Sequence, residues 1–397
     1  MTIALLEALT FGLGRLVDAA GRAGHRLCLL TGDRTIYTHE LALLGDDRLD
    51  VVDIDTTDIG ACERVLRAIP DLTGLINSTD TWALPGAELA SRLGLPGPGV
   101  QTARVLRDKG AVRNLLHRNG LSRGAAVTVA DIGQVDLPFP YVVKDSAGTS
   151  SRAVWLIRDE ADHAAAITAE HSSVLAGHLI AEPYFAGPLY SAETLSWNGE
   201  TRLLGVLSRQ LSPEPLRREE SAAFPVVFPD PGGDMEKWIT GVLAAAGHRG
   251  GFAHTEFVLT TYGPQVVEIN PRIGGALVGE ALTRSLDADV YAAMIAMAVG
   301  DRPTLLDATV TPVKGIAFAL LYPRTPGVLT GWEGLDRIKS FPGNPQWFPT
   351  ATLGTSIPHL ADQRGCTGIV LAEGPTAELA HHHVLAAAGA IAPVTGR

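Results

Sequence analysis

Residues 250–275, GGFAHTEFVLTTYGPQVVEINPRIGG, form the stretch around which the whole chain is organised. The apolar and β-branched residues from Phe252 to Leu259 predict a strand, and those from Gln265 to Ile269 predict a second one. Thr261 to Pro264 have the composition of a turn, so we expect the two strands to form an antiparallel hairpin.

The hairpin carries polar side chains among its apolar ones. Side chains two apart on a strand share a face, which groups His254 with Glu256 and Glu268 with Asn270. If both groups lie on the same face, two carboxylates and an amide oxygen converge. Such an all-oxygen set suits Mg²⁺, which keeps further positions for water and phosphate oxygens. Arg272 places a fixed cation beside the two acids.

A hairpin with a solvated polar face is the alternative interpretation, and Glu256 alone would not exclude it. The run from Glu268 to Arg272, followed by Gly274 and Gly275, favours a metal–phosphate site, because glycines let backbone N–H groups come close to a ligand. A polar set of this kind is costly to bury unless it has a binding partner.

The HTE motif at 254–256 and the EINPR-x-GG motif at 268–275 resemble the metal-binding hairpin of the ATP-grasp superfamily. The branch in question is that of the carboxylate–amine ligases, which includes the L-amino acid ligases. The resemblance implies ATP and Mg²⁺ as cofactors, with Mn²⁺ as a substitute. It implies that Glu256, Glu268 and Asn270 are the metal ligands.

The same resemblance implies roles for the residues beside the metal. Arg272 would stabilise the transferring phosphoryl group or an acyl phosphate, and backbone amides near Gly274 and Gly275 would form an oxyanion site. Related ligases often carry an arginine two residues before the first metal ligand. His254 stands there in this chain, and we expect it to bind the phosphoryl group or to act as a general base.

Length and composition bound the class of protein. The 397 residues exceed one compact core, and 46% hydrophobic with 19% charged residues is ordinary for a soluble globular protein. The net charge of −11, without a lysine- or arginine-rich run, argues against a nucleic-acid partner. No apolar run could span a bilayer and the N-terminus lacks a basic signal-peptide start, so we expect a cytoplasmic protein with no membrane partner.

The cysteines and a histidine tract offer no separate site. Cys28, Cys62 and Cys366 are far apart and lack C-x-x-C spacing, so we expect neither a disulfide framework nor a zinc site. His381 to His383 lie in an alanine-rich helical pattern, and we expect them on a solvated helix face. We expect small-molecule amino acid or amine substrates, and a homodimer.

Short apolar runs alternate with helical segments near the N-terminus. His25 to Thr31, Leu49 to Asp55 and Leu72 to Asn77 are predicted strands, and Pro85 to Leu93 is a predicted helix. This alternation predicts an open α/β sheet.

Ligands of open α/β sheets lie at the C-terminal ends of the strands, which makes Thr31 to Arg34 and Asn77 to Trp82 candidate site loops. Gly12 and Gly14 precede a helix but follow no convincing strand, so a dinucleotide-binding fingerprint is a poor match.

Residues 146–151, SAGTSS, form a loop of small residues between the predicted strands Tyr141–Val143 and Val154–Ile157. Such a loop lets backbone amides and hydroxyls fold over a polyphosphate, with the preceding lysine as a point charge on it. It resembles the flexible phosphate-covering loop of the family, which implies that the nucleotide is contacted by Lys144, Ser150 and Ser151.

Further nucleotide contacts follow from the resemblance. Lys109 lies where the family places a lysine on the nucleotide phosphates. Glu182 matches the first acidic position of the linker that binds adenine, and the segment continues to Tyr184. Leu189 stands where many members carry a ribose-binding glutamate, which leaves the way in which the ribose is held open.

The acceptor site is expected near residues 205–228. The family lines this site with a loop such as SPEPLRREES at 212–221, and Arg209 is the best-placed cation to hold a substrate carboxylate bidentately. Glu193 is a further substrate candidate that would face either the active site or solvent, and Gly274 is placed with it.

The expected fold is therefore a multidomain α/β and α+β protein with an ATP-grasp fold. We predict an N-terminal Rossmann-like domain at 1–102, an ATP-grasp module at 103–305 and a C-terminal α+β lobe at 306–397. Within the module, the small nucleotide lobe would span about 122–186 and the central lobe about 187–305.

The implied activity is an ATP-dependent ligase that joins an amino acid carboxylate to an amine through an acyl phosphate, with release of ADP and phosphate. One alternative is an ATP-grasp enzyme of another acceptor class, such as a carboxylase or a purine-pathway ligase. Another is an inactive nucleotide-binding sensor, against which the intact set of Glu256, Glu268, Asn270 and Arg272 argues.

Overall fold

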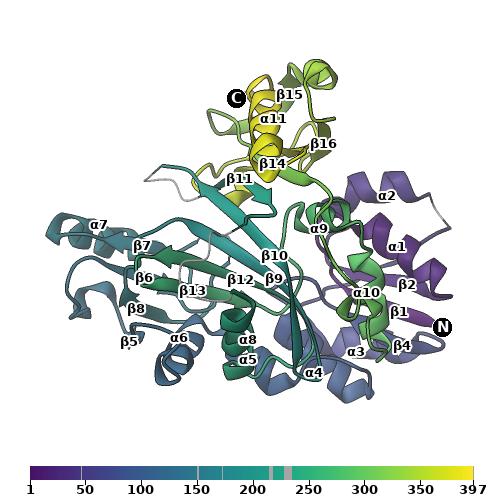
Figure 1. Ribbon diagram of the computed structural model, residues 1–397, viewed down its shortest axis with the longest axis horizontal. Coiled ribbons are helices and arrows are strands. Elements are labelled where there is room, and N and C mark those ends of the chain that lie inside the picture. The colour runs from purple at the N-terminus through teal and green to yellow at the C-terminus, as the bar shows by residue number, and fades with distance from the viewer. Residues whose placement is uncertain (46, 150–151, 172, 214–217, 228–234, 397) are drawn as a thin grey trace.

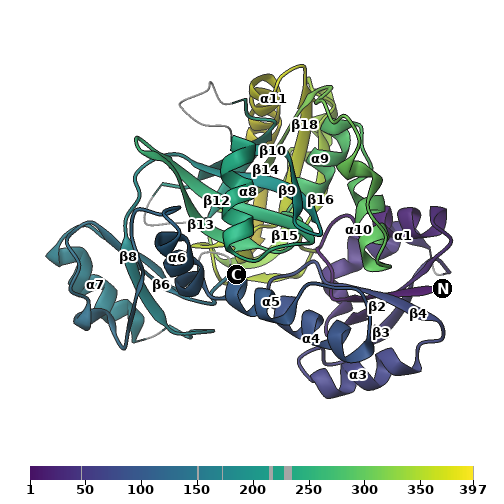
Figure 2. The ribbon, with the colours of Figure 1, turned by 60° about the horizontal axis from the view of Figure 1, so that its bottom comes forward.

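A computed structural model describes residues 1–45, 47–149, 152–171, 173–213, 218–227 and 235–396. Figure 1 shows a large central sheet with a small lobe on one side and the N-terminal elements on the other, while the last part of the chain rises above the sheet. Figure 2, turned by 60°, shows α5 (Val100–Arg107) between the N-terminal elements and the rest of the molecule.

The N-terminal elements form a four-stranded parallel sheet in the order β3-β2-β1-β4, which confirms the predicted open α/β architecture. Its strands are β1 (Thr2–Leu6), β2 (Arg26–Thr31), β3 (Asp50–Asp53) and β4 (Leu72–Ile76). Its helices are α1 (Leu13–Arg22), α2 (Thr38–Leu44), α3 (Ile59–Ala68) and α4 (Ala83–Leu93).

The expectation that no strand precedes Gly12 was wrong. β1 lies in the middle of the sheet, and its residues Ile3 to Leu6 are fully buried. The four consecutive apolar residues Ile3 to Leu6 do not show the alternation of a half-exposed strand, because both faces of this strand are covered. Gly12 caps α1 with φ at 93°, a left-handed conformation that glycine adopts without strain.

The small lobe is a four-stranded antiparallel sheet in the order β5-β8-β6-β7. Its strands are β5 (Val127–Val129), β6 (Tyr141–Asp145), β7 (Val154–Ile157) and β8 (Leu179–Pro183), and α7 (Glu160–Glu170) packs against it. The two helices α5 (Val100–Arg107) and α6 (Lys109–Arg118) precede this lobe in the chain.

The central sheet has eight strands in the order β13-β12-β9-β10-β11-β14-β18-β16, and all its neighbouring pairs are antiparallel. They are β9 (Leu189–Trp197), β10 (Glu200–Leu211), β11 (Glu219–Phe224), β12 (Gly251–Thr260), β13 (Gly263–Asn270), β14 (Gly315–Leu321), β16 (Gln346–Pro349) and β18 (Gly368–Gly374). The last three come from the C-terminal ninety residues, so that part of the chain extends the sheet.

One face of β12 is fixed by apolar packing. Ala253 and Phe257 lie in a buried cluster with residues of α6 and of α8 (Met235–Ala245), among them Leu116 and Val242. Side chains alternate along a strand, so His254 and Glu256 point to the opposite face of the sheet. Apolar burial on the helix side therefore positions the polar set on the other side.

The remaining elements complete the C-terminal part. Helix α11 (Ala377–Gly389) packs on β14 and β18, and a small sheet has the order β17-β15-β19. These strands are β15 (Gly327–Glu333), β17 (Ser356–Ile357) and β19 (Ala392–Gly396), and the helices after the hairpin are α9 (Val278–Leu286) and α10 (Val290–Ala298).

The histidine tract on α11 is only partly solvated, which corrects the expectation for it. His382 is exposed, but Nε2 of His381 lies 2.8 Å from Oγ of Ser221, and Nδ1 of His383 donates to the carbonyl of Glu373 over 2.8 Å. No helix among the described residues is long and apolar enough to cross a membrane. The division of the chain into three domains stays a prediction.

Candidate active site

The hairpin of β12 and β13 brings the predicted metal ligands together. Glu256 lies directly opposite Glu268, and His254 lies directly opposite Asn270. Directly opposed residues place their side chains on the same face of the sheet. The register therefore places both pairs of polar side chains on one face, as the predicted metal site requires.

Glu268 is held as a carboxylate by its neighbours. Its Oε2 lies 3.0 Å from Nζ of Lys109, and its Oε1 accepts a hydrogen bond of 2.8 Å from the side-chain amide of Asn270. Burial alone would raise the pKa of Glu268, but Lys109, Asn270 and Lys144 together hold the pKa of this carboxyl well below its usual range. The group is ionised at every physiological pH.

The oxygen ligands of Glu256, Glu268 and Asn270 fit a divalent cation that takes its remaining ligands from water and substrate. The pKa of Glu256 is also lowered, since Arg209 and His254 outweigh the effect of its burial, so both acids carry charge. Within the described ranges, no group of three or more histidine, cysteine, aspartate or glutamate side chains is arranged to hold a metal. Two carboxylates and one amide suit Mg²⁺ better than zinc, because Mg²⁺ takes its other oxygens from water and phosphate.

A buried triad lies at the nucleotide end of the site. Lys144 on β6 lies 2.6 Å from Oε1 of Glu182 on β8, and Nε of Arg113 on α6 lies 3.0 Å from Oε2 of the same carboxylate. Although burial would raise the pKa of Glu182, the two cations hold it at about 2. Burial lowers the pKa of Lys144, an effect that Glu182 counteracts. Two cations and one anion leave a net positive charge here.

These groups line one cleft of about 490 Å³ between the small lobe and the central sheet. Apolar side chains of both sheets form part of its wall, including Val142, Leu156 and Leu189, and Tyr184 lies beside them. The aliphatic side chain of Leu189 has no group that could hydrogen-bond to a ribose. The carboxylate of Glu182 is engaged by Lys144 and Arg113, so its predicted contact with adenine stays a prediction.

A second charged network lies beside the two acids. Nη2 of Arg209 lies 2.8 Å from Oε2 of Glu219 and 3.4 Å from Oε1 of Glu256. Oε1 of Glu219 and Nε of Arg209 are buried without a hydrogen-bond partner among the described residues. Burial raises the pKa of Glu219, whereas the surrounding carboxylates raise the pKa of Arg209 against the effect of burial.

His254 is held between two carboxylates. Its Nδ1 lies 2.5 Å from Oε1 of Glu193, and its Nε2 lies 3.4 Å from Oε1 of Glu256. Burial would lower the pKa of His254, as would Arg209, whose Nη1 lies 3.1 Å from Nε2, but Glu193 and Glu256 outweigh both and raise it to about 9, so the ring favours the imidazolium at neutral pH. A Cβ atom at Gly274 would lie 2.8 Å from Nδ1 of His254, so this glycine lets the backbone pack against the ring.

Arg272 is held by a residue of the loop that follows β4. Its Nε donates to Oδ1 of Asp80 over 2.8 Å, its Nη2 pairs with Oδ2 of the same aspartate, and its Nη1 donates to the carbonyl of Ile273 over 2.8 Å. Asp80 follows β4, at the C-terminal end of a parallel strand. The cation is thereby fixed in the cleft by an element far from it in sequence.

The structure places most, but not all, of the predicted site residues on this cleft. Those that line it are Lys109, Lys144, Glu182, Tyr184, Arg209, His254, Glu256, Glu268, Asn270, Arg272 and Gly275. Glu193 is 1% exposed and, among the described residues, contacts the site through His254, while Gly274 does not line the cleft. Ser150 and Ser151 lie outside the described residues.

Several lining residues were missed by the sequence reasoning, among them Arg113, Asp80, Glu219 and Gln363. Arg113 lies in a helical pattern in which an arginine is typical of a solvated face. Asp80 belongs to a loop that was a candidate, whereas the other candidate loop, Thr31 to Arg34, does not line the cleft. Gln363 comes from the C-terminal part, and its Nε2 lies 3.3 Å from Oε2 of Glu219, a contact that tertiary packing alone creates.

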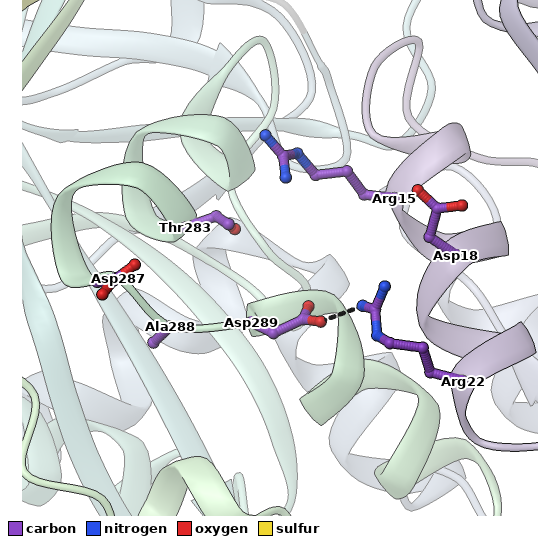
Figure 3. A pocket seen from close by; sticks show the side chains of 7 residues that line it. All are labelled: Arg15, Asp18, Arg22, Thr283, Asp287, Ala288 and Asp289. Carbon is purple, nitrogen blue, oxygen red and sulfur yellow. Dashed lines mark hydrogen bonds and ion pairs between the residues drawn. The ribbon is translucent and has the colours of Figure 1, made fainter.

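A separate hollow of about 290 Å³ lies between α1 and the α9–α10 turn, away from this chemistry. Figure 3 shows Arg22 reaching across it to Asp289, with Arg15 and Asp18 on the same helix as Arg22. Arg15 pairs with Glu280. Its arginines are thus engaged in contacts between the N-terminal elements and α9–α10, and we assign it a structural role.

Two family models match parts of the chain that contribute residues to the cleft. The model of the ATP-grasp domain matches residues 137–280, and the model of the L-amino acid ligase C-terminal domain 2 matches residues 319–396. The first range contains both acids of the hairpin, Lys144 and Arg272. The chain thus combines an ATP-grasp domain with a C-terminal domain of the L-amino acid ligase type.

The individual relatives of this chain are distant. An uncharacterized protein, y4rH, of Sinorhizobium fredii is 26% identical over 381 residues, which cover 91% of the chain and 76% of the relative. Carnosine synthase 1 of Gallus gallus is 27% identical over 246 residues, which cover 55% of the chain but only 26% of that protein. The L-amino acid ligase of Bacillus licheniformis has a TM-score of 0.83 over 100% of this chain and 99% of its own, at 21% identity, which shows a shared fold.

Proposed function

We propose that this ATP-grasp ligase joins the carboxylate of one amino acid to the amine of another, and that ATP is converted to ADP and phosphate. One observation carries the proposal. The same cleft contains the paired acids Glu256 and Glu268, the phosphate-side cations Lys109 and Lys144, and a buried arginine, Arg209, beside the acids. The matched C-terminal domain of L-amino acid ligases and the carnosine synthase relative support an amino acid as substrate.

In the first step, a carboxylate oxygen of the donor amino acid attacks the terminal phosphorus of ATP, and the bond to the ADP oxygen breaks. Lys109 and Lys144 orient the phosphates, and Arg272 balances the charge that gathers on the transferring group. Glu256, Glu268 and Asn270 would hold Mg²⁺, which when bound neutralises charge on the phosphate oxygens. The product is an acyl phosphate.

In the second step, the amine nitrogen of the acceptor attacks the acyl carbon, the carbon–oxygen bond to the phosphate breaks, and the leaving phosphate takes up the proton that the nitrogen loses. The pKa of His254, at about 9, means that its ring already carries a proton at neutral pH. Of its two expected roles, binding the phosphoryl group fits an imidazolium, whereas a general base must be free to accept a proton.

Arg209 is proposed to hold a substrate carboxylate. It lines the cleft while its side chain is 8% exposed, and an arginine fork matches a carboxylate bidentately. Glu219 balances the charge of Arg209 in the free protein. Together they provide an ionic site for a zwitterionic amino acid next to the reacting groups.

Release of ADP with single amino acids and with pairs of them tests the proposal. We expect ADP release to require amino acids and to be accompanied by a product whose mass equals that of the two substrates less one water. ADP release that depends on bicarbonate alone would favour the carboxylase class. Binding of ATP without ADP release for any pair would favour the sensor.

A further inference from the structure

A second cavity, of about 480 Å³, lies on the other side of Arg272 from the cleft. Its walls come from the end of β4, from α4, from the start of β12 and from α10. Of the described residues that line the cavity, only Arg272 also lines the cleft. The cavity lies beyond the carboxyl end of a parallel strand, where open α/β sheets hold their ligands.

The lining of this cavity is mainly apolar. Ile76, Ala87, Phe252 and Met294 are all less than one tenth exposed and face it from four different elements. Its volume falls within the range typical of small-molecule sites, roughly 300–1,000 Å³. Methionines such as Met294 adapt their shape to an apolar guest.

The charged residues of the lining indicate which charge the ligand carries. Among its described residues, Arg249 and Arg272 are the charged ones, and neither aspartate nor glutamate is present. Arg272 already forms an ion pair with Asp80. Arg249 is exposed, donates one hydrogen bond of 3.0 Å to the carbonyl of Asn198, and has no ion pair with a described residue.

We propose that this cavity is a second binding site, for a small apolar molecule that carries a carboxylate and no positive charge. The apolar body fills the cavity and the carboxylate pairs with Arg249. A free ammonium group would have no acidic partner among the described lining residues, and the cations Arg249 and Arg272 would repel it. The site does not rest on the proposed ligase reaction, because its residues other than Arg272 lie outside the cleft.

Calorimetric titration of the full chain with 3-phenylpropionate tests the site. We expect one molecule to bind per chain with a submillimolar Kd, and the stoichiometry to persist at saturating ATP and Mg²⁺. Arg249→Gln should weaken binding about tenfold or more through loss of a charge-assisted hydrogen bond. Met297→Trp, which adds bulk to the half-buried lining, should abolish it.

Arg118→Gln is the matched control, since Arg118 is exposed on α6 and lines neither cavity, and its affinity for the probe should equal that of the wild type. Phenylalanine, which adds an ammonium group to the same body, should bind at least tenfold more weakly. The proposal is overturned if the probe does not bind, if Arg249→Gln binds it as tightly as the control, if ATP eliminates binding, or if phenylalanine binds equally well.

Discussion

The Nζ atom of Lys109 lies 3.0 Å from Oε2 of Glu268. The same Nζ donates to the carbonyl of Gly148 over 2.6 Å, in the loop expected to cover the phosphates. A proposed phosphate lysine and a proposed metal ligand therefore satisfy each other in the free protein. Binding of ATP with Mg²⁺ would exchange these partners, since the phosphates take the lysine and the cation takes the carboxylate.

Glu268→Gln should reduce ADP formation by about a thousandfold or more, because several kcal/mol of transition-state stabilisation depend on a charged metal ligand. The amide has nearly the shape of the carboxylate and can still meet Lys109, so the fold should survive. Steady-state kinetics and a thermal melt measure both. Glu333→Gln, an exposed glutamate on β15, is the matched control. Near-normal turnover of Glu268→Gln at ordinary Mg²⁺ would remove the metal assignment.

Lys144→Ala should weaken ATP binding by about ten- to a hundredfold, because it removes a buried cation from the phosphate side of the cleft. Arg113 remains to pair with Glu182, so the variant does not leave that carboxylate alone. Calorimetry with a non-hydrolysable ATP analogue measures the change. Lys339→Ala, an exposed lysine, should bind the analogue like the wild type. Equal affinity of the two variants would contradict the role of Lys144.

The phosphate-covering loop gives a separate test. Residues 146–151 are predicted to be mobile without nucleotide, and Ser150 and Ser151 lie outside the described residues. Trypsin should cleave after the exposed Arg152 in the free protein, and ATP with Mg²⁺ should slow this cleavage several-fold. Cleavage at an unchanged rate with ATP would show that this segment does not close over the nucleotide.

Arg209→Lys should raise the KM for an amino acid substrate about ten- to a hundredfold and leave the KM for ATP within about twofold. Lysine keeps the buried charge beside Glu219 but loses the bidentate geometry, so the fold should hold. Initial rates at varied amino acid and varied ATP separate the two constants. A rise in the KM for ATP alone would place Arg209 with the nucleotide instead.

His248, a buried histidine outside the active site, should make the stability of the protein depend on pH. Burial lowers its pKa from 6.5 to about 4, so the native state favours the neutral ring. The stabilisation is present above pH 6.5 and is lost as the pH falls toward 4, because the unfolded chain then binds the proton more readily. Between pH 7.5 and 5 the wild type should lose about 2 kcal/mol more of its free energy of unfolding than His248→Gln does.

Urea denaturation at the two pH values measures this difference. His382→Gln, which replaces an exposed histidine on α11, should show the wild-type pH dependence. If His248→Gln and His382→Gln lose stability equally on acidification, the buried histidine does not carry the effect.

The sequence was most informative where local pattern and chemistry coincide. The alternation in β12 and β13 predicted the hairpin and grouped Glu256 with His254, because one apolar face packs on α6 and α8. β1 escaped prediction because both of its faces are buried and no alternation remains. No local pattern could show that Asp80 holds Arg272.

The same limit applies to the C-terminal part of the chain. Its strands β14, β16 and β18 extend the central sheet, a pairing that the sequence did not indicate. Strand pairing between distant segments depends on which sheet edge is free after folding, and a single sequence does not record that edge. Gln363 reaches Glu219 for the same reason.

The central claim is that a substrate carboxylate receives the terminal phosphoryl group of ATP. Its most direct test is a reaction with ¹⁸O in the carboxylate of the donor amino acid, followed by mass spectrometry of the released phosphate and nucleotide. We predict that one ¹⁸O atom appears in inorganic phosphate once the amine is added, since the acyl phosphate breaks at its carbon–oxygen bond. Label in AMP, or turnover without label in phosphate, would contradict the account.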